Sequence, residues 1–314
     1  MANNPLDTEL LDRAIIFAVK AHAGTERRGK GFPYIVHPME AMEIVSTMTA
    51  DQEILAAAAL HDTVEDTDVT VEQLLTHTSG VPDYFDETVL DEYEELWIEY
   101  PNYKIRHNSD LLPLFIDKPM MHRRGEKFQY NNTGYVLLAM IIEKISGTDF
   151  DVFLKESIFD VCDMKSTGYY ELDRLPAKCA NNYIYCYDTD DYRTNIFSVG
   201  AKGTGDGGAF ITVLDLMRFW KGLLEHKILS EEMVKKMLSK QSGNGEDPEE
   251  GYYGYGVWII DNPNGEDYAY MQGLDPGVSV ISEYNPNNGM ISIMVSNYGD
   301  NVWSMMRKLR KDNY

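Results

Sequence analysis

Apolar residues recur every three or four positions through the first seventy residues, which is the spacing of one face of an α-helix. The first run begins at Leu11 and ends before Gly24, a residue suited to a helix C-cap. Pro38 fits the first position of a second helix over 38–48, and Asp51 can cap a third helix. The pattern therefore predicts a helical N-terminal segment.

The rest of the chain mixes helical spacing with strand-like runs. Helices are expected over 136–145 and from 213 onwards. Apolar runs separated by Asn-Pro-Asn and Asn-Asn-Gly turns predict strands, at 253–260, 278–283 and 290–296. We interpret the aromatic residues at 252–255 as core and edge-strand packing. The fold class is therefore α+β, with a mostly antiparallel sheet.

Composition is that of a globular protein: 44% of the 314 residues are hydrophobic and 25% are charged. The net charge of −23 argues against nucleic acid or anionic lipid as a partner. An anionic substrate would have to be held by a local basic cluster or a metal ion.

The sequence also predicts a cytoplasmic protein. Its three cysteines, Cys162, Cys179 and Cys186, form no CxxC pair, which suits a reducing compartment. No apolar run is long enough to span a bilayer, and the N-terminus lacks the positive region of a signal peptide.

Candidate chemistry lies in the string His61-Asp62-Thr63-Val64-Glu65-Asp66. A four-residue step places His61 and Glu65 on one helix face, with Asp62 and Asp66 on the adjoining face. Imidazole and carboxylate ligands suit a divalent ion such as Mn²⁺, which can activate water. Glu65 and Asp66 could handle protons beside such an ion.

The segments 21–24, 27–38 and 60–67 closely resemble the HD-type hydrolases of the RelA/SpoT alarmone family. That family removes the 3′-pyrophosphate of (p)ppGpp with Mn²⁺. The resemblance implies metal ligands and an acidic catalytic pair: His37, His61 and Asp62, then Glu65 and Asp66. It also implies Arg28 as a substrate contact, and Lys30 is a second local cation that could hold phosphate. The resemblance stops near residue 74, and nothing downstream matches the later helix that supplies the family's last metal-binding aspartate.

From Leu74 the chain looks like serine β-lactamases of class C type and the related penicillin-binding carboxypeptidases and esterases. The likeness is carried by separated segments in family order: 74–84, 128–135, 205–208 and the helix from 213. It implies an α/β sandwich with a mostly antiparallel sheet. The substrate that it implies is a small acyl or peptide compound.

That family needs three motifs, of which one is present in full. Tyr130-Asn131-Asn132 fits Tyr-x-Asn, which implies a proton-handling Tyr130 and a substrate-binding Asn132. The basic third motif falls at Met271-Gln272-Gly273, where Met271 replaces the cation. No serine has lysine three positions later, so the nucleophile motif is absent. Ser79 is expected at a helix end and not as a nucleophile. This part is therefore predicted to be catalytically inactive.

The two resemblances divide the chain into residues 1–70, a partial HD-type segment, and residues 71–314, an incomplete β-lactamase-like domain. Thr70 and Gln73 form a capping box that should start a helix at the junction. Each part lacks packing partners of its family, so we expect exposed apolar surface, marginal stability or self-association. The whole looks like a chimera of two fragments.

Three functions remain open from the sequence. The first is a Mn²⁺-dependent alarmone pyrophosphohydrolase. The second is a serine acyl hydrolase of the β-lactamase and penicillin-binding group. The third is a non-catalytic pocket around Tyr130 and Asn132 that binds a peptide or a small acyl compound.

Overall fold

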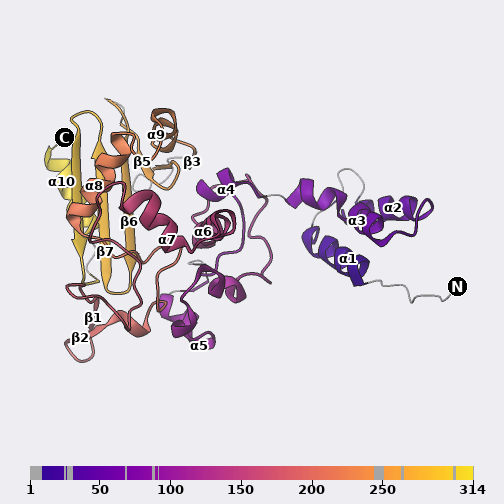
Figure 1. The fold of residues 1–314 in the computed structure, drawn as a ribbon, viewed down its shortest axis with the longest axis horizontal. Helices are drawn as coiled ribbons and strands as arrows, with labels where there is room; N and C mark the ends of the chain where they lie inside the picture. Colours follow the sequence, from indigo (N-terminus) through magenta and orange to yellow (C-terminus); the bar gives the residue numbers. More distant parts are fainter. Residues whose placement is uncertain are drawn as a thin grey trace. The chain divides into compact units, whose positions relative to one another are not determined.

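The computed structural model describes residues 9–24, 26, 31–67, 69–86, 89–90, 92–243, 251–262, 265–299 and 302–313. The chain divides into two compact units, Met1–Thr70 and Val71–Tyr314. We call them the helical unit and the sheet unit (Figure 1).

The described part of the helical unit contains three helices: α1 (Glu9–Ala21), α2 (Val36–Ser46) and α3 (Gln52–Thr67). Both α1 and α2 pack against α3. The residues buried between the helices are mostly small: Ala14, Ala18, Leu55, Ala56 and Ala59. Because alanine side chains are short, the helix backbones can approach closely, and the unit is built around a thin core.

The predicted C-terminal end of the first helix and the predicted N-terminal cap of the third helix are confirmed. Gly24 follows α1 with a φ of 75°, the left-handed conformation that favours glycine after a helix. The carboxylate of Asp51 accepts a hydrogen bond of 2.9 Å from the backbone N–H of Glu53, so it caps α3 as expected.

The prediction for the second helix is wrong by two residues. It begins at Val36 and not at Pro38. The backbone N–H groups of Val36 and His37 donate to the carbonyls of Pro33 and Tyr34, over 3.2 and 2.9 Å, and these bonds form a first turn ahead of Pro38. His37 therefore lies within the helix.

The sheet unit is organised around a six-stranded antiparallel sheet in which the strand order follows the chain order (Figure 1). Its strands are β3 (Ser242–Gly243), β4 (Tyr252–Tyr253), β5 (Trp258–Ile260), β6 (Tyr268–Asp275), β7 (Val278–Asn285) and β8 (Met290–Ser296). This confirms the predicted α+β class and the antiparallel sheet.

Helices cover both faces of this sheet. The indole N–H of Trp220, in α8 (Val213–Leu224), donates to the hydroxyl of Ser282 over 3.1 Å. Arg310, in α10 (Trp303–Asn313), is paired with Glu283. Because Ser282 and Glu283 are consecutive in β7, their side chains point to opposite faces, and α8 and α10 therefore lie on opposite sides of the sheet.

The remaining described elements precede the sheet or connect to it. The helices are α4 (Val71–Leu75), α5 (Leu96–Glu99), α6 (Asn132–Ser146), α7 (Phe150–Leu154) and α9 (Glu231–Met237). The short 3-10 helices are η1 (Tyr93–Glu95), η2 (Asn102–Lys104), η3 (Asn108–Leu114) and η5 (Asn195–Phe197). One π-helical turn is η4 (Lys155–Phe159). A separate hairpin joins β1 (Tyr183–Cys186) to β2 (Asp191–Thr194).

The prediction of one strand over 253–260 is wrong. The chain reverses within this segment, so that Tyr253 in β4 pairs with Trp258 in β5. Gly256, with a φ of 76°, permits the reversal. The other two predicted strands are confirmed as β7 and β8.

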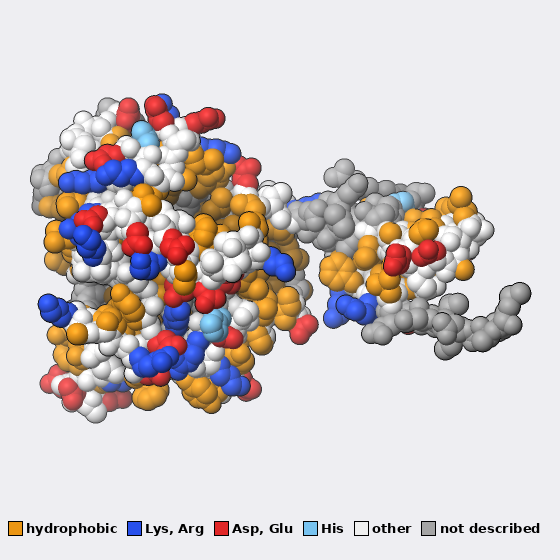
Figure 2. Space-filling view, in the orientation of Figure 1, with side chains coloured by type: hydrophobic (Ala, Val, Ile, Leu, Met, Phe, Trp, Pro, Cys, Tyr) orange, Lys and Arg blue, Asp and Glu red, His pale blue; other side chains and the backbone are white. Residues whose placement is uncertain are grey.

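Apolar side chains remain exposed on the helical unit, as its fragmentary resemblance led us to expect. Phe17 in α1 is 58% exposed, and Met48 after α2 is 82% exposed. Figure 2 shows apolar side chains among charged ones over the visible surface of both units. No helix in the part of the chain that the structure describes is long and apolar enough to cross a membrane.

Candidate functional site: an aromatic pocket in the sheet unit

The pocket is built on a contact between the end of α4 and the start of α6. His77 follows α4 with a φ of 54° and is only 1% exposed. Its Nδ1 accepts a hydrogen bond of 3.0 Å from the backbone N–H of Asn131. Its ring lies 4.3 Å from that of Tyr130 and 4.6 Å from that of Tyr253, measured between centroids. His77 therefore has a structural role, and it fixes the segment that carries Tyr130.

The N-terminus of α6 positions Asn132. The side chain of Asn131 caps the helix, because its Oδ1 accepts from the N–H of Gly134 over 2.8 Å. The carboxylate of Asp83 accepts from the N–H groups of Asn132 and Thr133 over 2.9 and 3.2 Å. Burial raises the pKa of Asp83 to about 6, although these hydrogen bonds favour its ionised form.

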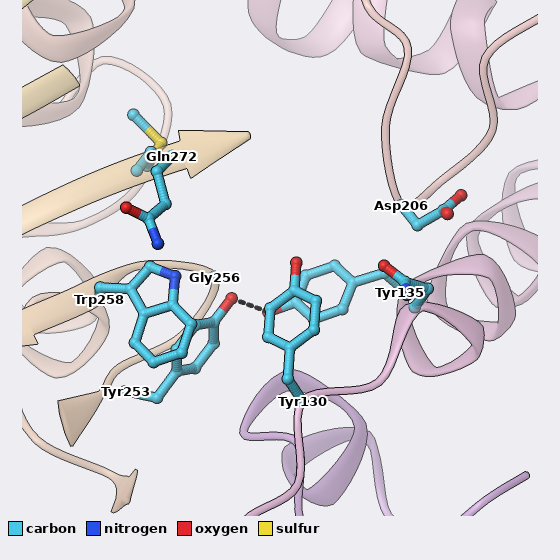
Figure 3. Close-up of a pocket in the computed structure, with 9 residues that line it drawn as sticks. Tyr130, Tyr135, Asp206, Tyr253, Gly256, Trp258 and Gln272 are labelled. Atoms are coloured by element: carbon cyan, nitrogen blue, oxygen red, sulfur yellow. Dashed lines mark hydrogen bonds between the residues drawn. The ribbon is translucent and has the colours of Figure 1, made fainter. Parts of the chain in front are cut away.

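Beside this helix end lies a cavity of about 160 Å³ (Figure 3). Its wall combines tyrosines, one tryptophan, two residues of β6 and a few polar groups. These residues are Tyr130, Asn132, Tyr135, Asp206, Tyr253, Gly256, Trp258, Met271 and Gln272.

One wall of the cavity is a cluster of aromatic rings. Tyr130 stacks on Trp258, with ring centroids 5.9 Å apart and planes within 9° of parallel. Tyr253 meets Trp258 edge-on at 4.9 Å. The hydroxyl of Tyr135 donates to the carbonyl of Leu75 over 2.9 Å and lies 3.5 Å from the hydroxyl of Tyr253. Burial raises the pKa of Tyr135 to about 12, so this phenol stays protonated at neutral pH.

Polar groups face one another across the opening. Figure 3 shows the hydroxyl of Tyr130 pointing into the space between Gln272 and Asp206. Asp206 accepts a hydrogen bond of 2.5 Å from the hydroxyl of Thr204, and another from the hydroxyl of Tyr84. Burial raises the pKa of the Asp206 carboxyl. The opening therefore offers hydrogen-bond donors and acceptors to a ligand.

Among the described residues, the pocket wall contains no serine, threonine, cysteine, lysine, arginine or histidine. Met271, at the position where the resemblance of the sequence implies a basic residue, carries no charge. Ser79 was expected at a helix end, but it lies four residues beyond the last residue of α4. It is buried in a bend, where its Oγ accepts from the N–H of Val81 at 3.4 Å. The described wall can bind polar and aromatic groups, but it offers no nucleophile that a substrate could acylate.

Of the residues predicted for the metal, the structure describes only the side chain of His37. Its ring meets that of Tyr34 edge-on at 6.0 Å. Arg28, Lys30 and the side chains of the α3 candidates lie outside the described residues; those candidates are His61, Asp62, Glu65 and Asp66. Within the described part of the chain, no three His, Cys, Asp or Glu residues converge on a metal position.

The composition of the predicted ligand set nevertheless fits a divalent transition ion. Imidazole nitrogens and a carboxylate oxygen are suitable ligands for Mn²⁺. His37 lies on α2, and α3, which carries His61 and Asp62, packs against α2. The helix continues through Thr67, so Glu65 and Asp66 lie about one turn beyond the histidine.

Sequence reasoning named Tyr130, Asn132 and the motif position at Met271 and Gln272, but it proposed none of the other lining residues for a site: Tyr135, Asp206, Tyr253, Gly256 and Trp258. The sequence assigned the aromatic residues at 252–255 to packing. This is correct for Tyr253, which is buried, but Tyr253 also lines the pocket. The signal that could have found Trp258 is the Gly-Tyr-Gly turn between two aromatic residues, which makes Tyr253 and Trp258 cross-strand partners.

Comparison with known proteins confirms both resemblances read from the sequence. A family model described as Beta-lactamase matches residues 50–312, and a model described as HD domain matches residues 14–82. Among solved structures, the chain is similar to a penicillin binding protein from Bacillus halodurans. The two are 36% identical with a TM-score of 0.71, over 77% of this chain and 72% of the other.

Two curated relatives represent the two parts. Penicillin-binding protein 4* of Bacillus subtilis is 31% identical over 207 residues, which cover 62% of this chain and 43% of that protein. The guanosine-3′,5′-bis(diphosphate) 3′-pyrophosphohydrolase of Vibrio cholerae is 45% identical over 69 residues, which cover 22% of this chain and 10% of that protein. The chain thus matches less than half of the length of either relative.

Proposed function

Because the chain belongs to the beta-lactamase family, we propose that its sheet unit binds a small peptide-like or acylated molecule in the aromatic pocket and releases it unchanged. One observation supports this proposal above the others. The pocket keeps the polar ends of Tyr130, Asn132 and Gln272 beside an aromatic wall, while no serine, threonine or cysteine is among its described lining residues.

The polar groups suit an amide ligand. The side-chain amide of Gln272 can donate to a carbonyl and accept from an N–H, and the hydroxyl of Tyr130 can do both. The ring of Tyr130, which is 44% exposed and stacks on the buried Trp258, offers an apolar surface for a hydrocarbon or aromatic substituent. A peptide bond with an apolar neighbour therefore matches the described wall.

The same wall lacks the groups that acyl transfer requires. Acyl transfer by this route needs a nucleophile with an adjacent base, and donors that stabilise the oxyanion. Asn132 and Gln272 can donate hydrogen bonds, but the described wall contains no lysine or histidine to activate a hydroxyl. We therefore expect binding without turnover.

Equilibrium binding measured by tryptophan fluorescence tests the proposal. The probes are benzylpenicillin and an acetylated peptide that ends in D-alanyl-D-alanine. We expect saturable binding that weakens about threefold to tenfold in Tyr130→Phe and in Gln272→Met, because each variant loses a hydrogen bond to the ligand. Tyr103→Phe, at an exposed tyrosine that is not among the lining residues, is the matched control. Absence of saturable binding, or equal affinity in all variants, would contradict the proposal.

For the helical unit we propose Mn²⁺-dependent removal of the 3′-pyrophosphate of a guanosine alarmone. The observation that favours it is the 45% identity to the pyrophosphohydrolase of Vibrio cholerae. Two sets of residues carry the proposed chemistry: the metal ligands His37, His61 and Asp62, and the acidic pair Glu65 and Asp66. Mn²⁺, when bound, activates water for attack on phosphorus.

The chain's own residues then handle protons and charge. Glu65 and Asp66 can take the proton from the attacking water and return one to the leaving oxygen. Arg28 and Lys30 can pair with the phosphate oxygens, which the chain's overall charge of −23 would otherwise repel.

Titration calorimetry with Mn²⁺, combined with an assay of pyrophosphate release from ppGpp, tests this second proposal. We expect both metal binding and release to be lost in His61→Ala. His226→Asn, at an exposed histidine of the sheet unit with a φ of 59°, should leave both unchanged. Mn²⁺ binding that persists in His61→Ala, or release that needs no metal, would overturn the proposed ligand set.

A further inference from the structure

The β1–β2 hairpin carries a row of tyrosines on one face. Its register pairs Tyr185 with Tyr192 and Tyr183 with Thr194, so these side chains share a face. A bridge between Tyr183 and Tyr298 brings a further tyrosine alongside from beyond β8. Figure 1 shows the hairpin at the lower margin of the sheet unit.

The rings form a continuous chain of contacts. Centroid distances are 5.8 Å between Tyr183 and Tyr298, 5.2 Å between Tyr298 and Tyr192, and 5.3 Å between Tyr192 and Tyr185. Tyr187 extends the row, 4.8 Å from Tyr185. We call these five residues the tyrosine platform. Three of them are largely open to solvent: Tyr187 at 89%, Tyr192 at 51% and Tyr298 at 42%.

The platform is bordered by negative charge. Asp190, in the turn of the hairpin, accepts a hydrogen bond of 2.5 Å from the hydroxyl of Tyr185. The hairpin's only cation, Arg193, alternates with Tyr192 and therefore points to the opposite face. There it donates to Glu94 over 2.6 Å. The exposed ring faces and the carboxylate of Asp190 thus present the same sign of charge to a ligand.

Elsewhere in this unit, tyrosine rings beside carboxylates are covered by the chain's own cations. Three cations lie over a tyrosine ring, with ring-centroid distances of 4.7 to 5.1 Å, and also pair with a carboxylate. These are Lys236 (Tyr255 and Glu72), Lys240 (Tyr252 and Asp267) and Arg310 (Tyr270 and Glu283). Among the described residues, no lysine or arginine covers a ring of the tyrosine platform in this way.

We propose that the tyrosine platform is a docking surface for a basic peptide segment of another protein, whose arginine or lysine side chains lie over the rings and pair with Asp190. At three other places in the sheet unit, one of its own lysine or arginine side chains lies over a tyrosine ring and pairs with a carboxylate in the same way. The net charge of −23 draws a basic partner towards the chain, and the platform gives it a defined place to bind.

Fluorescence anisotropy with a labelled oligoarginine peptide tests the proposal on the full chain. The matched probe replaces every arginine with citrulline, which has the same shape and no charge. We expect the arginine peptide to bind more tightly, and to lose about threefold in affinity in each of Tyr187→Ala, Tyr192→Ala and Asp190→Asn. Asparagine tolerates the φ of 51° at position 190, so that variant should keep the turn.

Two controls separate the platform from the general negative charge. Tyr103→Ala removes another exposed tyrosine, and Asp149→Asn removes another exposed carboxylate. Both should bind the peptide as the parent chain does. Equal affinity of the platform variants and the parent would overturn the proposal, as would equal binding of the citrulline peptide. Binding of a chito-oligosaccharide that is lost in the tyrosine variants, with peptide binding unchanged, would also overturn it and identify a sugar site.

Discussion

The backbone N–H of Asn131 donates to Nδ1 of His77 over 3.0 Å, and this bond joins the end of α4 to the start of α6. Because Nδ1 is the acceptor, the proton of the neutral ring is on Nε2. Burial lowers the pKa of His77 to about 3, so the ring is neutral wherever the fold is intact near neutral pH. The next residue upstream of Asn131 is Tyr130, and the bond therefore sets the position of the pocket's exposed tyrosine.

Removing this imidazole should destabilise the fold. His77→Ala leaves the N–H of Asn131 without its acceptor and opens a cavity among the aromatic rings. We expect the free energy of unfolding to fall by about 2 to 4 kcal/mol. His77→Asn, which keeps a polar group and tolerates the φ of 54°, should lose less. Urea unfolding measures both, and equal losses would show that the hydrogen bond and backbone conformation at this position contribute nothing.

Asp275 should make the fold less stable as the pH rises, whereas His77, whose pKa is lowered, makes the fold less stable as the pH falls. Burial, helped by the nearby charge of Asp206, raises the pKa of Asp275 to about 7. The folded state therefore holds a proton that the unfolded state releases near pH 4, and the stability gained at low pH is lost as pH rises towards 7. Asp275→Asn should flatten this decline by several kcal/mol, since each unit of pKa difference corresponds to about 1.4 kcal/mol.

Unfolding curves of the parent and of Asp275→Asn, recorded at several pH values between about 4 and 8, check this result. Asp173→Asn is the control, because an exposed ion pair with Arg106 lowers the pKa of Asp173 and its variant should not flatten the decline. Parallel curves for the parent and Asp275→Asn would contradict the prediction.

The interior of α8 provides a test of packing. A Cβ atom added to Gly222 would lie 2.3 Å from the Sγ of buried Cys162. We expect Gly222→Ala to cost about 1 to 2 kcal/mol despite its better helix propensity. Adding Cys162→Ala should recover much of that loss, since the smaller side chain makes room. Thermal unfolding of the two single variants and the double variant measures the coupling. Simple additivity of the three values would rule out the contact.

The sequence predicted features whose causes are local. The Asp51 cap, the Asn-rich turn between β7 and β8, and those two strands depend on neighbouring residues and were found as expected. The split of 253–260 into β4 and β5 was missed because apolar periodicity does not register a reversal within a continuous aromatic run. The tyrosine platform could not be read from the sequence, because Tyr298 reaches the hairpin only through the bridge to Tyr183, more than a hundred positions away.

The exposed apolar surface of the helical unit should make the chain self-associate. Phe17 and Met48 expose large apolar side chains to solvent, and burying them against a second copy is favourable. We expect sedimentation velocity to show concentration-dependent association, which Phe17→Lys combined with Met48→Lys weakens. Lys substitution at the exposed Ile145 of the sheet unit is the control. A chain that stays monomeric at all concentrations would contradict this prediction.

Intact-mass spectrometry after incubation with a penicillin tests most directly whether the sheet unit binds its ligand without covalent chemistry. The described residues that line the pocket include no serine, threonine or cysteine, so no acyl-enzyme should form there. We predict that the mass of the chain stays unchanged while the same penicillin binds reversibly in the fluorescence titration. A stoichiometric adduct with the mass of the penicillin, resistant to denaturation, would contradict this.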